Sequence, residues 1–225
     1  MLLAGPACPG DGLAPSLFST DIMATPRLIV GLGNPTAEHE NDRHNAGFWF
    51  LEALARHHGE ALKRDAKFFG NTGRLRIGTA DVHLLQPMTY MNRSGQAAAA
   101  VARFYRIPPA EILVAYDELD LAPGTARFKL GGSSTHNGLR DITSAFGGQA
   151  AGGAAYWRLR IGIGHPRDFR QSGKPVVDYV LDRPSREHKR QIDESIERAI
   201  DAMPLVLKDD WPEAMKQLHT VASTD

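Results

Sequence analysis

Residues 27–35 read RLIVGLGNP, and this stretch decides the fold of the 225-residue chain. Its first six residues form a short apolar run that ends at a Gly-Asn-Pro loop, which is the pattern of a buried strand. Downstream, Phe48, Leu51, Leu54 and Ala55 recur at helical spacing and predict an amphipathic helix. A strand, a polar loop and a helix in this order favour an α/β architecture.

The remaining pattern extends this architecture along the chain. Helices are predicted over 96–105, with Asn92 or Ser94 as the N-cap, and from Pro184 onward, where Pro204 should break or kink the helix. A short helix is expected over 211–218. We therefore expect one α/β domain over 27–225, in which helices flank a twisted mixed central sheet. The other expected strands cover residues 74–77, 82–85, 112–115, 126–129 and 158–161.

The first 26 residues differ in composition from the rest of the chain. They are rich in Gly and Pro and contain no Lys or Arg, which argues against a secretory signal or an organellar transit peptide. We expect residues 1–26 to be a flexible tail or a mis-assigned start, with a natural start near Met23.

The composition excludes several classes of protein. Lys and Arg total 26, as do Asp and Glu, so contact with nucleic acid requires a local basic patch. The single cysteine, Cys8, can form neither an internal disulfide nor a cysteine zinc site, which fits a reducing compartment. No apolar run approaches the ~20 residues needed to cross a bilayer. We expect a cytoplasmic protein without a membrane segment.

Four loops hold most of the unusual polar residues, and each follows a strand pattern or opens a helix. In α/β folds the loops at the carboxyl ends of strands carry the functional sites. The four loops are 31–35 with 43–45 close behind, 90–92, 117–120 and 134–138.

Two catalytic classes fit these loops poorly. In a G-x-G-x-x-G dinucleotide motif the third glycine would fall on Thr36, and Pro35 removes an amide that a pyrophosphate would use. The serine hydrolase motif G-x-S-x-G is absent, and Ser134 beside His136 is typical of a turn.

A magnesium site stays open as an alternative. Asp117, Glu118 and Asp120 follow a predicted strand, and carboxylates are ligands that Mg²⁺ prefers. The same residues are more typical of a solvated strand end, which is the favoured interpretation of the pattern.

Histidine remains as the catalytic candidate, because its pKa near ~6.5 lets it accept a proton at neutral pH. Asp117 is available to orient the imidazole of His44, and three neutral amides, Asn34, Asn92 and Asn137, suit a substrate carbonyl. This set favours attack of water on an acyl group without a metal. A base supplies about 10²–10⁴-fold and one oxyanion donor about 10²–10³-fold, which is enough for an activated ester.

Basic residues alternate along two later strands. Arg127 and Lys129 share one strand face, and Arg158 and Arg160 share another. They form either a solvated sheet face or a patch that positions the phosphates of a nucleic acid.

Together these segments resemble the bacterial peptidyl-tRNA hydrolase family, whose members cut the ester between a peptide and the 3′ end of tRNA. The resemblance runs in order from Arg27 to about Leu218. It implies metal-independent hydrolysis without a cofactor, peptidyl-tRNA as the partner and a monomeric enzyme. The matching pieces are RLIVGLGNP, RHNAGFWF, AKFFG, TYMNRSG, DELDLAPGTARFKLGG, HNGLRDI and RLRIGIGHP.

The resemblance also implies residue roles. His44 matches the family's catalytic base and Asp117 the acid that orients it. Lys129 and Arg160 match the basic pair that clamps the 5′ phosphate of tRNA. The positions that match substrate-binding residues are Asn34, Phe69, Met91, Asn92 and Asn137.

The chain departs from the family pattern at a few positions. His39 stands where the family usually carries Tyr, so its contact with substrate is open. Loop 131–137 is one residue shorter than usual and lacks its first histidine, which leaves the position of Asn137 open. Residues 147–156 and 169–173 resemble surface insertions.

A catalytically inactive RNA-binding relative, like the chloroplast splicing factors of this superfamily, is the alternative function. The presence of His44, Asp117 and the three asparagines argues against it.

Overall fold

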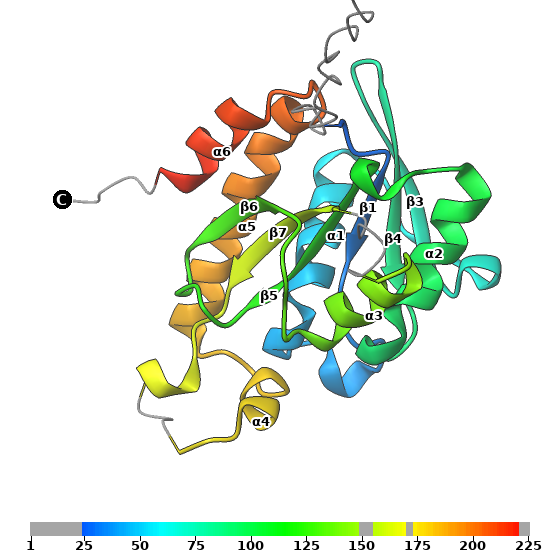
Figure 1. Ribbon diagram of the computed structural model, residues 1–225. Coiled ribbons are helices and arrows are strands. Elements are labelled where there is room, and N and C mark those ends of the chain that lie inside the picture. Colours follow the sequence, from blue (N-terminus) through cyan, green and yellow to red (C-terminus); the bar gives the residue numbers. More distant parts are fainter. Residues whose placement is uncertain (1–23, 149–154, 170–172, 221–225) are drawn as a thin grey trace, which may run out of the picture.

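The computed structural model describes residues 24–148, 155–169 and 173–220, which build one seven-stranded sheet with helices on both faces (Figure 1). The strand order is β2-β3-β4-β1-β5-β7-β6, with β1 at the centre. The strands are β1 (Leu28–Gly31), β2 (Lys63–Asp65), β3 (Gly70–Ile77), β4 (Ala80–Pro87), β5 (Ile112–Glu118), β6 (Ala126–Leu130) and β7 (Trp157–Gly162).

The sheet is mixed, as the sequence predicts. β1 runs parallel to β4 and to β5, and β5 runs parallel to β7. The outer strands β3 and β6 are antiparallel to their neighbours, and so is β2. The carboxyl ends of β1, β4, β5 and β7 therefore meet at one edge of the sheet, where three of the four polar loops begin.

The helices form two layers. α1, α5 and α6 pack on one face of the sheet, and α2 and α3 on the other (Figure 1). No helix of the described ranges is long and apolar enough to cross a membrane. The helices are α1 (Ala46–His57), α2 (Ser94–Tyr105), α3 (Asn137–Ala145), α4 (Val176–Val180), α5 (Arg186–Val206) and α6 (Trp211–His219).

The central position of β1 in the sheet explains why the strand is apolar at every position. Ile29 faces the core beneath α1 and α5, whereas Leu28 and Val30 face the core beneath α2. A strand that is covered on both faces has no wet side, so the alternation of polar and apolar residues is lost.

The structure corrects two helix details. α5 continues through Pro204 to Val206, because the proline lies in the last turn, where only two helical residues follow it. Neither Asn92 nor Ser94 caps α2: its N-cap is Arg93, and the Ser94 hydroxyl donates to the carbonyl of Met91 at 2.9 Å instead.

Several expectations fall partly or wholly outside the described residues. They concern the tail at 1–26, of which 1–23 are not described, and the insertions at 147–156 and 169–173, of which 149–154 and 170–172 are not described.

The start of α1 lies against the end of β1, with glycine on both sides of the contact. A Cβ on Gly47 would lie 2.3 Å from the Ala115 carbonyl oxygen and 2.4 Å from the Leu32 nitrogen. The backbone of Leu32 joins the two elements, because its N–H donates to Ala115 and its carbonyl accepts from Phe48. This close approach fixes the residues just before α1 against the end of β5.

We predict that Gly47→Ala destabilises the protein. The alanine gains about 1 kcal/mol of helix propensity, but the clash with two backbone atoms costs about 1–3 kcal/mol or more. The measurement is the urea midpoint of unfolding, with Gly173→Ala as the control, because a Cβ there meets no atom within 4 Å. Equal midpoints for the two variants would contradict the account.

Candidate active site

His44 and Asp117 form the centre of the site. His44 lies in the 3₁₀ turn Arg43–Asn45 directly before α1, and Asp117 lies near the carboxyl end of β5. The Nδ1 atom of His44 is 2.9 Å from Oδ1 and 3.0 Å from Oδ2 of Asp117. Since Nδ1 donates to the carboxylate, the neutral imidazole leaves Nε2 unprotonated and able to accept a proton. The structure thus brings together the two residues that the sequence analysis paired.

A second histidine contacts the same carboxylate. The Nε2 atom of His136 lies 2.9 Å from Asp117 Oδ1, and the two imidazole centroids are 5.0 Å apart. The N–H of Leu139 donates to His136 Nδ1 at 3.4 Å, so the proton of the neutral ring is on Nε2. Sequence reasoning took His136 for part of a turn, and it is in fact the N-cap of α3.

The electrostatics favour an ionised Asp117 and a basic His44. Burial by itself raises the pKa of Asp117, but the charges and hydrogen bonds of His44 and His136 outweigh it and leave this pKa well below its usual range. Burial lowers the pKa of His44, whereas the charge and hydrogen bond of Asp117 and the charge of Asp42 raise it, with a net increase. The group that accepts the proton is therefore a stronger base than free histidine.

A cavity of about 780 Å³ opens beside this pair. His44, Asp117 and His136 lie in its lining, together with Tyr116 and Glu118 at the carboxyl end of β5. α4 contributes the apolar side chains of Val176 and Val177. The other predicted residues in its lining are Asn34, Met91, Asn92 and Asn137.

The three asparagines are held differently. Asn34 is buried, and its Oδ1 accepts a hydrogen bond from the N–H of Met91 at 3.0 Å. Within the described ranges no protein group bonds its Nδ2, which remains able to donate to a ligand. Asn92 and Asn137 are exposed at the cavity, and Asn137 is the first residue of α3 despite the shorter loop before it.

Phe69 is the one member of the predicted substrate-binding set, besides His39, that lies outside the lining of this cavity. This residue does not line the cavity: it ends a 3₁₀ turn with a left-handed backbone, φ 52°, and its ring is exposed. The aromatic residues that line the cavity are Tyr90, beside Met91, and Tyr116. A signal for Tyr90 was present, because it precedes two predicted site residues in the same loop.

The structure also places His39 away from the cavity lining. Its Nδ1 lies 2.6 Å from an oxygen of Asp42, and its side chain is 23% exposed. His39 therefore pairs with a carboxylate two residues before the candidate base, and a direct contact with substrate in this cavity is not seen.

The predicted basic pair lies on one face of the sheet edge. In the register of β6 and β7, Arg160 lies opposite Arg127 and Lys129 lies opposite Arg158. All four side chains therefore share one face of the sheet. Lys129 is exposed, whereas Nε of Arg160 bonds Glu118 at 3.0 Å. The pair thus consists of one exposed cation and one that is anchored beside the cavity.

Two of the carboxylates that the magnesium alternative requires, Asp117 and Glu118, bind different partners. Asp117 contacts the two histidines, whereas Glu118 accepts from the hydroxyl of Tyr116 and from Arg160. Among the described residues, the group whose donor atoms lie close enough to share a metal ion is His44, Asp117 and His136, all within 4.8 Å.

Comparison with known proteins assigns the chain to a family. The family model described as peptidyl-tRNA hydrolase matches residues 28–225. The chain belongs to the peptidyl-tRNA hydrolase family. It is 52% identical to the peptidyl-tRNA hydrolase of Pseudoalteromonas atlantica, over 88% of this chain and 98% of the relative, and 51% identical to that of Polynucleobacter asymbioticus, over 87% and 99%.

Solved structures of the family share the fold. The crystal structure of peptidyl-tRNA hydrolase from Acinetobacter baumannii is 45% identical, with a TM-score of 0.79, and covers 87% of this chain and 95% of its own. A complex of peptidyl-tRNA hydrolase with N-propanol is 44% identical, with a TM-score of 0.80, over 89% and 97%. These matches bear out the resemblance that the ordered motifs carried.

We predict that Asp117→Asn changes the pH dependence of hydrolysis as well as its rate. The reaction needs neutral His44, so kcat/KM rises with pH through the pKa of His44, which lies above the usual ~6.5. Without the carboxylate charge, burial dominates and the acid limb moves to lower pH. The plateau falls by about 10²–10⁴-fold, because the tautomer is no longer fixed.

The control for this profile is Asp120→Asn, which lies at the same cavity but is exposed. Its acid limb should match that of the wild type. An Asp117→Asn limb that stays in place or moves to higher pH would contradict the assigned pairing.

Proposed function

We propose that this chain hydrolyses the ester between a peptide and the 3′-terminal ribose of tRNA, with His44 as general base and Asp117 as the residue that orients it. Family membership gives the reaction class, an ester hydrolysis on peptidyl-tRNA. The observation that carries the residue assignment is the contact of His44 Nδ1 with both oxygens of the buried Asp117 carboxylate.

The proposed reaction begins with a water molecule between His44 Nε2 and the acyl carbon. Nε2 takes a proton as the water oxygen attacks, which produces a tetrahedral intermediate and an imidazolium. Asp117 stabilises this cation through Nδ1. When the acyl–oxygen bond breaks, the imidazolium returns its proton to the 3′ oxygen of the ribose, so the products are a free carboxyl group and tRNA.

The amide groups at the cavity suit the developing oxyanion. Nδ2 of Asn34 and the side chains of Asn92 and Asn137 donate without titrating, and all three residues line the cavity that holds His44. We assign them to the substrate carbonyls, and Met91 to the apolar wall beside them. One well-placed donor is worth about 10²–10³-fold in rate.

His136 supports the same carboxylate at Oδ1, the oxygen that His44 also contacts. Its ring donates Nε2–H to Asp117, and its Nδ1 accepts from the N–H of Leu139. Both features keep a proton off Asp117 while His44 is charged, so we assign His136 a positioning role.

The activity assay tests the function directly. Purified protein is incubated with diacetyl-lysyl-tRNA and EDTA, and free tRNA is measured. We expect turnover to persist in the chelator and to be lost in His44→Ala with tRNA affinity retained. Loss of turnover on chelation would indicate an ion at His44, Asp117 and His136, and tRNA binding without release of tRNA would indicate the inactive RNA-binding alternative.

We further propose that the basic face of β6 and β7 holds a phosphate of the tRNA, with Lys129 and Arg160 as the clamp. Exposure of Lys129 and the anchoring of Arg160 by Glu118 beside the reaction cavity support this assignment. Since the substrate is produced by translation, we place the enzyme in the cytoplasm and expect it to act as a monomer.

We predict that Lys129→Ala and Arg160→Gln each weaken tRNA binding and make its salt dependence shallower. Each lost phosphate contact reduces the slope of log K against log salt by about one unit. The glutamine retains a donor for Glu118, so the rim of the cavity is preserved. Arg74→Ala, at an ion pair on β3 near the other edge of the sheet, serves as the control. An unchanged salt slope in both variants would contradict the proposed phosphate clamp.

A further inference from the structure

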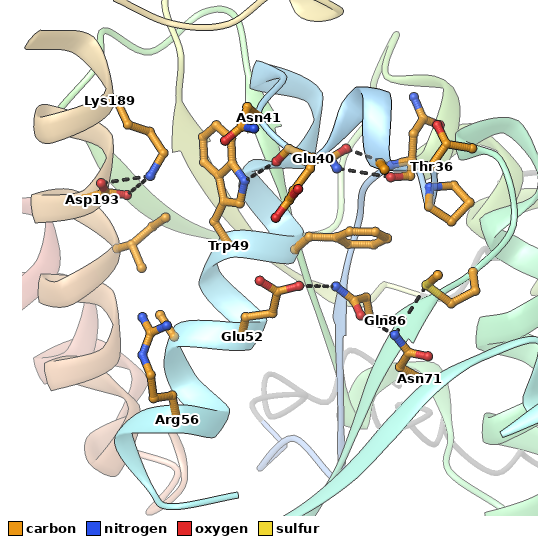
Figure 2. A pocket seen from close by; sticks show the side chains of 18 of the residues that line it. Thr36, Glu40, Asn41, Trp49, Glu52, Arg56, Asn71, Gln86, Lys189 and Asp193 are labelled. Atoms are coloured by element: carbon orange, nitrogen blue, oxygen red, sulfur yellow. Dashed lines mark hydrogen bonds and ion pairs between the residues drawn. The ribbon is translucent and has the colours of Figure 1, made fainter. Parts of the chain in front are cut away.

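A second cavity of about 650 Å³ lies between α1, α5 and the ends of β3 and β4, outside the site described above. Figure 2 shows its lining. Phe48 and Trp49 of α1 and Met88 after β4 provide apolar surface, and polar side chains surround it (Figure 2). Apart from Asn34 at its border, the proposed reaction uses none of its lining residues.

The second cavity adjoins the reaction cavity at a single residue. Asn34 lines both cavities, and its neighbour Pro35 lines only the second. The Asn34 backbone is fixed by Asn45, whose Oδ1 accepts from Asn34 N–H at 2.8 Å and whose Nδ2 donates to the Asn34 carbonyl at 3.1 Å. The second cavity therefore begins on the far side of Asn34 from the reaction cavity, where a chain bound at His44 would reach it by passing Asn34.

The polar lining is held in place before any ligand binds. Asn71 donates to Gln86 at 2.7 Å, and Gln86 donates to Glu52 at 2.6 Å, in a relay across β3, β4 and α1. Gln86 is 5% exposed, so this relay is built into the sheet. The indole N–H of Trp49 donates to the carbonyl of Glu40 at 3.0 Å, which fixes the opposite rim.

The charges of the cavity are not balanced internally. Glu40 and Glu52 point toward the same space, on one side of the Trp49 ring (Figure 2). Neither carboxylate forms an ion pair with a Lys or Arg of the described residues. The lining holds two cations, Arg56 and Lys189, of which Lys189 is paired with Asp193 at 2.6 Å. With Asp193 and Glu197 the carboxylates of the lining outnumber its cations by four to two. The space between the two glutamates therefore favours a cation and repels a phosphate.

We propose that this second cavity binds the residues of the peptide upstream of the ester, and that Glu40 and Glu52 select peptides with a Lys or Arg side chain there. The inference rests on the proposed hydrolysis of peptidyl-tRNA, because that substrate has a peptide leading away from the bond at His44. The fixed amides suit a peptide backbone, the aromatic floor suits an aliphatic stem, and the carboxylates suit its cationic end.

The test compares substrates that differ only upstream of the ester. Three tRNAs carry the same acetylated tripeptide with Lys, Gln or Glu at its first position, and a fourth carries a single acetylated amino acid. For the wild type we expect kcat/KM to fall in the order Lys, Gln, Glu, with about a three- to tenfold span at low salt, as for a partly exposed ion pair.

The double variant Glu40→Gln/Glu52→Gln identifies the residues responsible. The new amide at position 52 keeps an oxygen that can accept from Gln86, so the relay is retained. We expect the variant to abolish the order among the tripeptides and to leave the single-residue substrate unchanged. Glu213→Gln on α6, outside the lining of either cavity, should keep the wild-type order.

The outcomes separate this inference from the proposed function. Hydrolysis of the single-residue substrate with no order among the tripeptides overturns the peptide site and leaves the function standing. An order that persists in the double variant overturns the roles of Glu40 and Glu52. Absence of hydrolysis from all four substrates overturns the proposed function itself.

Discussion

The shared carboxylate of Asp117 is the interaction on which the rest of the site depends. An ionised carboxylate that is 2% exposed costs several kcal/mol of lost hydration unless donors replace the water. His44 and His136 are the two donors, and they approach from different elements. The position of Asp117 at the end of a fully buried strand thus requires the turn before α1 and the N-cap of α3 to meet at one point.

Close backbone packing brings the turn before α1 to the end of β5. The glycines at 31 and 47 let α1 begin directly against β1, which brings the turn that carries His44 to the end of β5. The parallel strands then deliver the remaining polar loops to the same edge of the sheet. Asn34 lines both cavities, so this residue lies between the reaction centre and the proposed binding site of the peptide.

Sequence patterns predicted the parts of the structure that burial determines. The continuous apolar run of β1 and the helical spacing of α1 were readable because each reports which faces are covered. β2 and α3 left weak signals: β2 has three residues and no buried side chain, and α3 follows a glycine- and serine-rich turn. His136 was missed because only the three-dimensional approach of that turn to Asp117 distinguishes it.

The tautomers of the two histidines test the central claim most directly. We propose to record the ¹⁵N shifts of the imidazoles at a pH above the raised pKa of His44, with His44→Gln and His136→Gln spectra for assignment. The account predicts opposite neutral tautomers: the proton of His44 on Nδ1 and that of His136 on Nε2, both donated to Asp117. The same tautomer in both rings, or a proton on Nε2 of neutral His44, would contradict it.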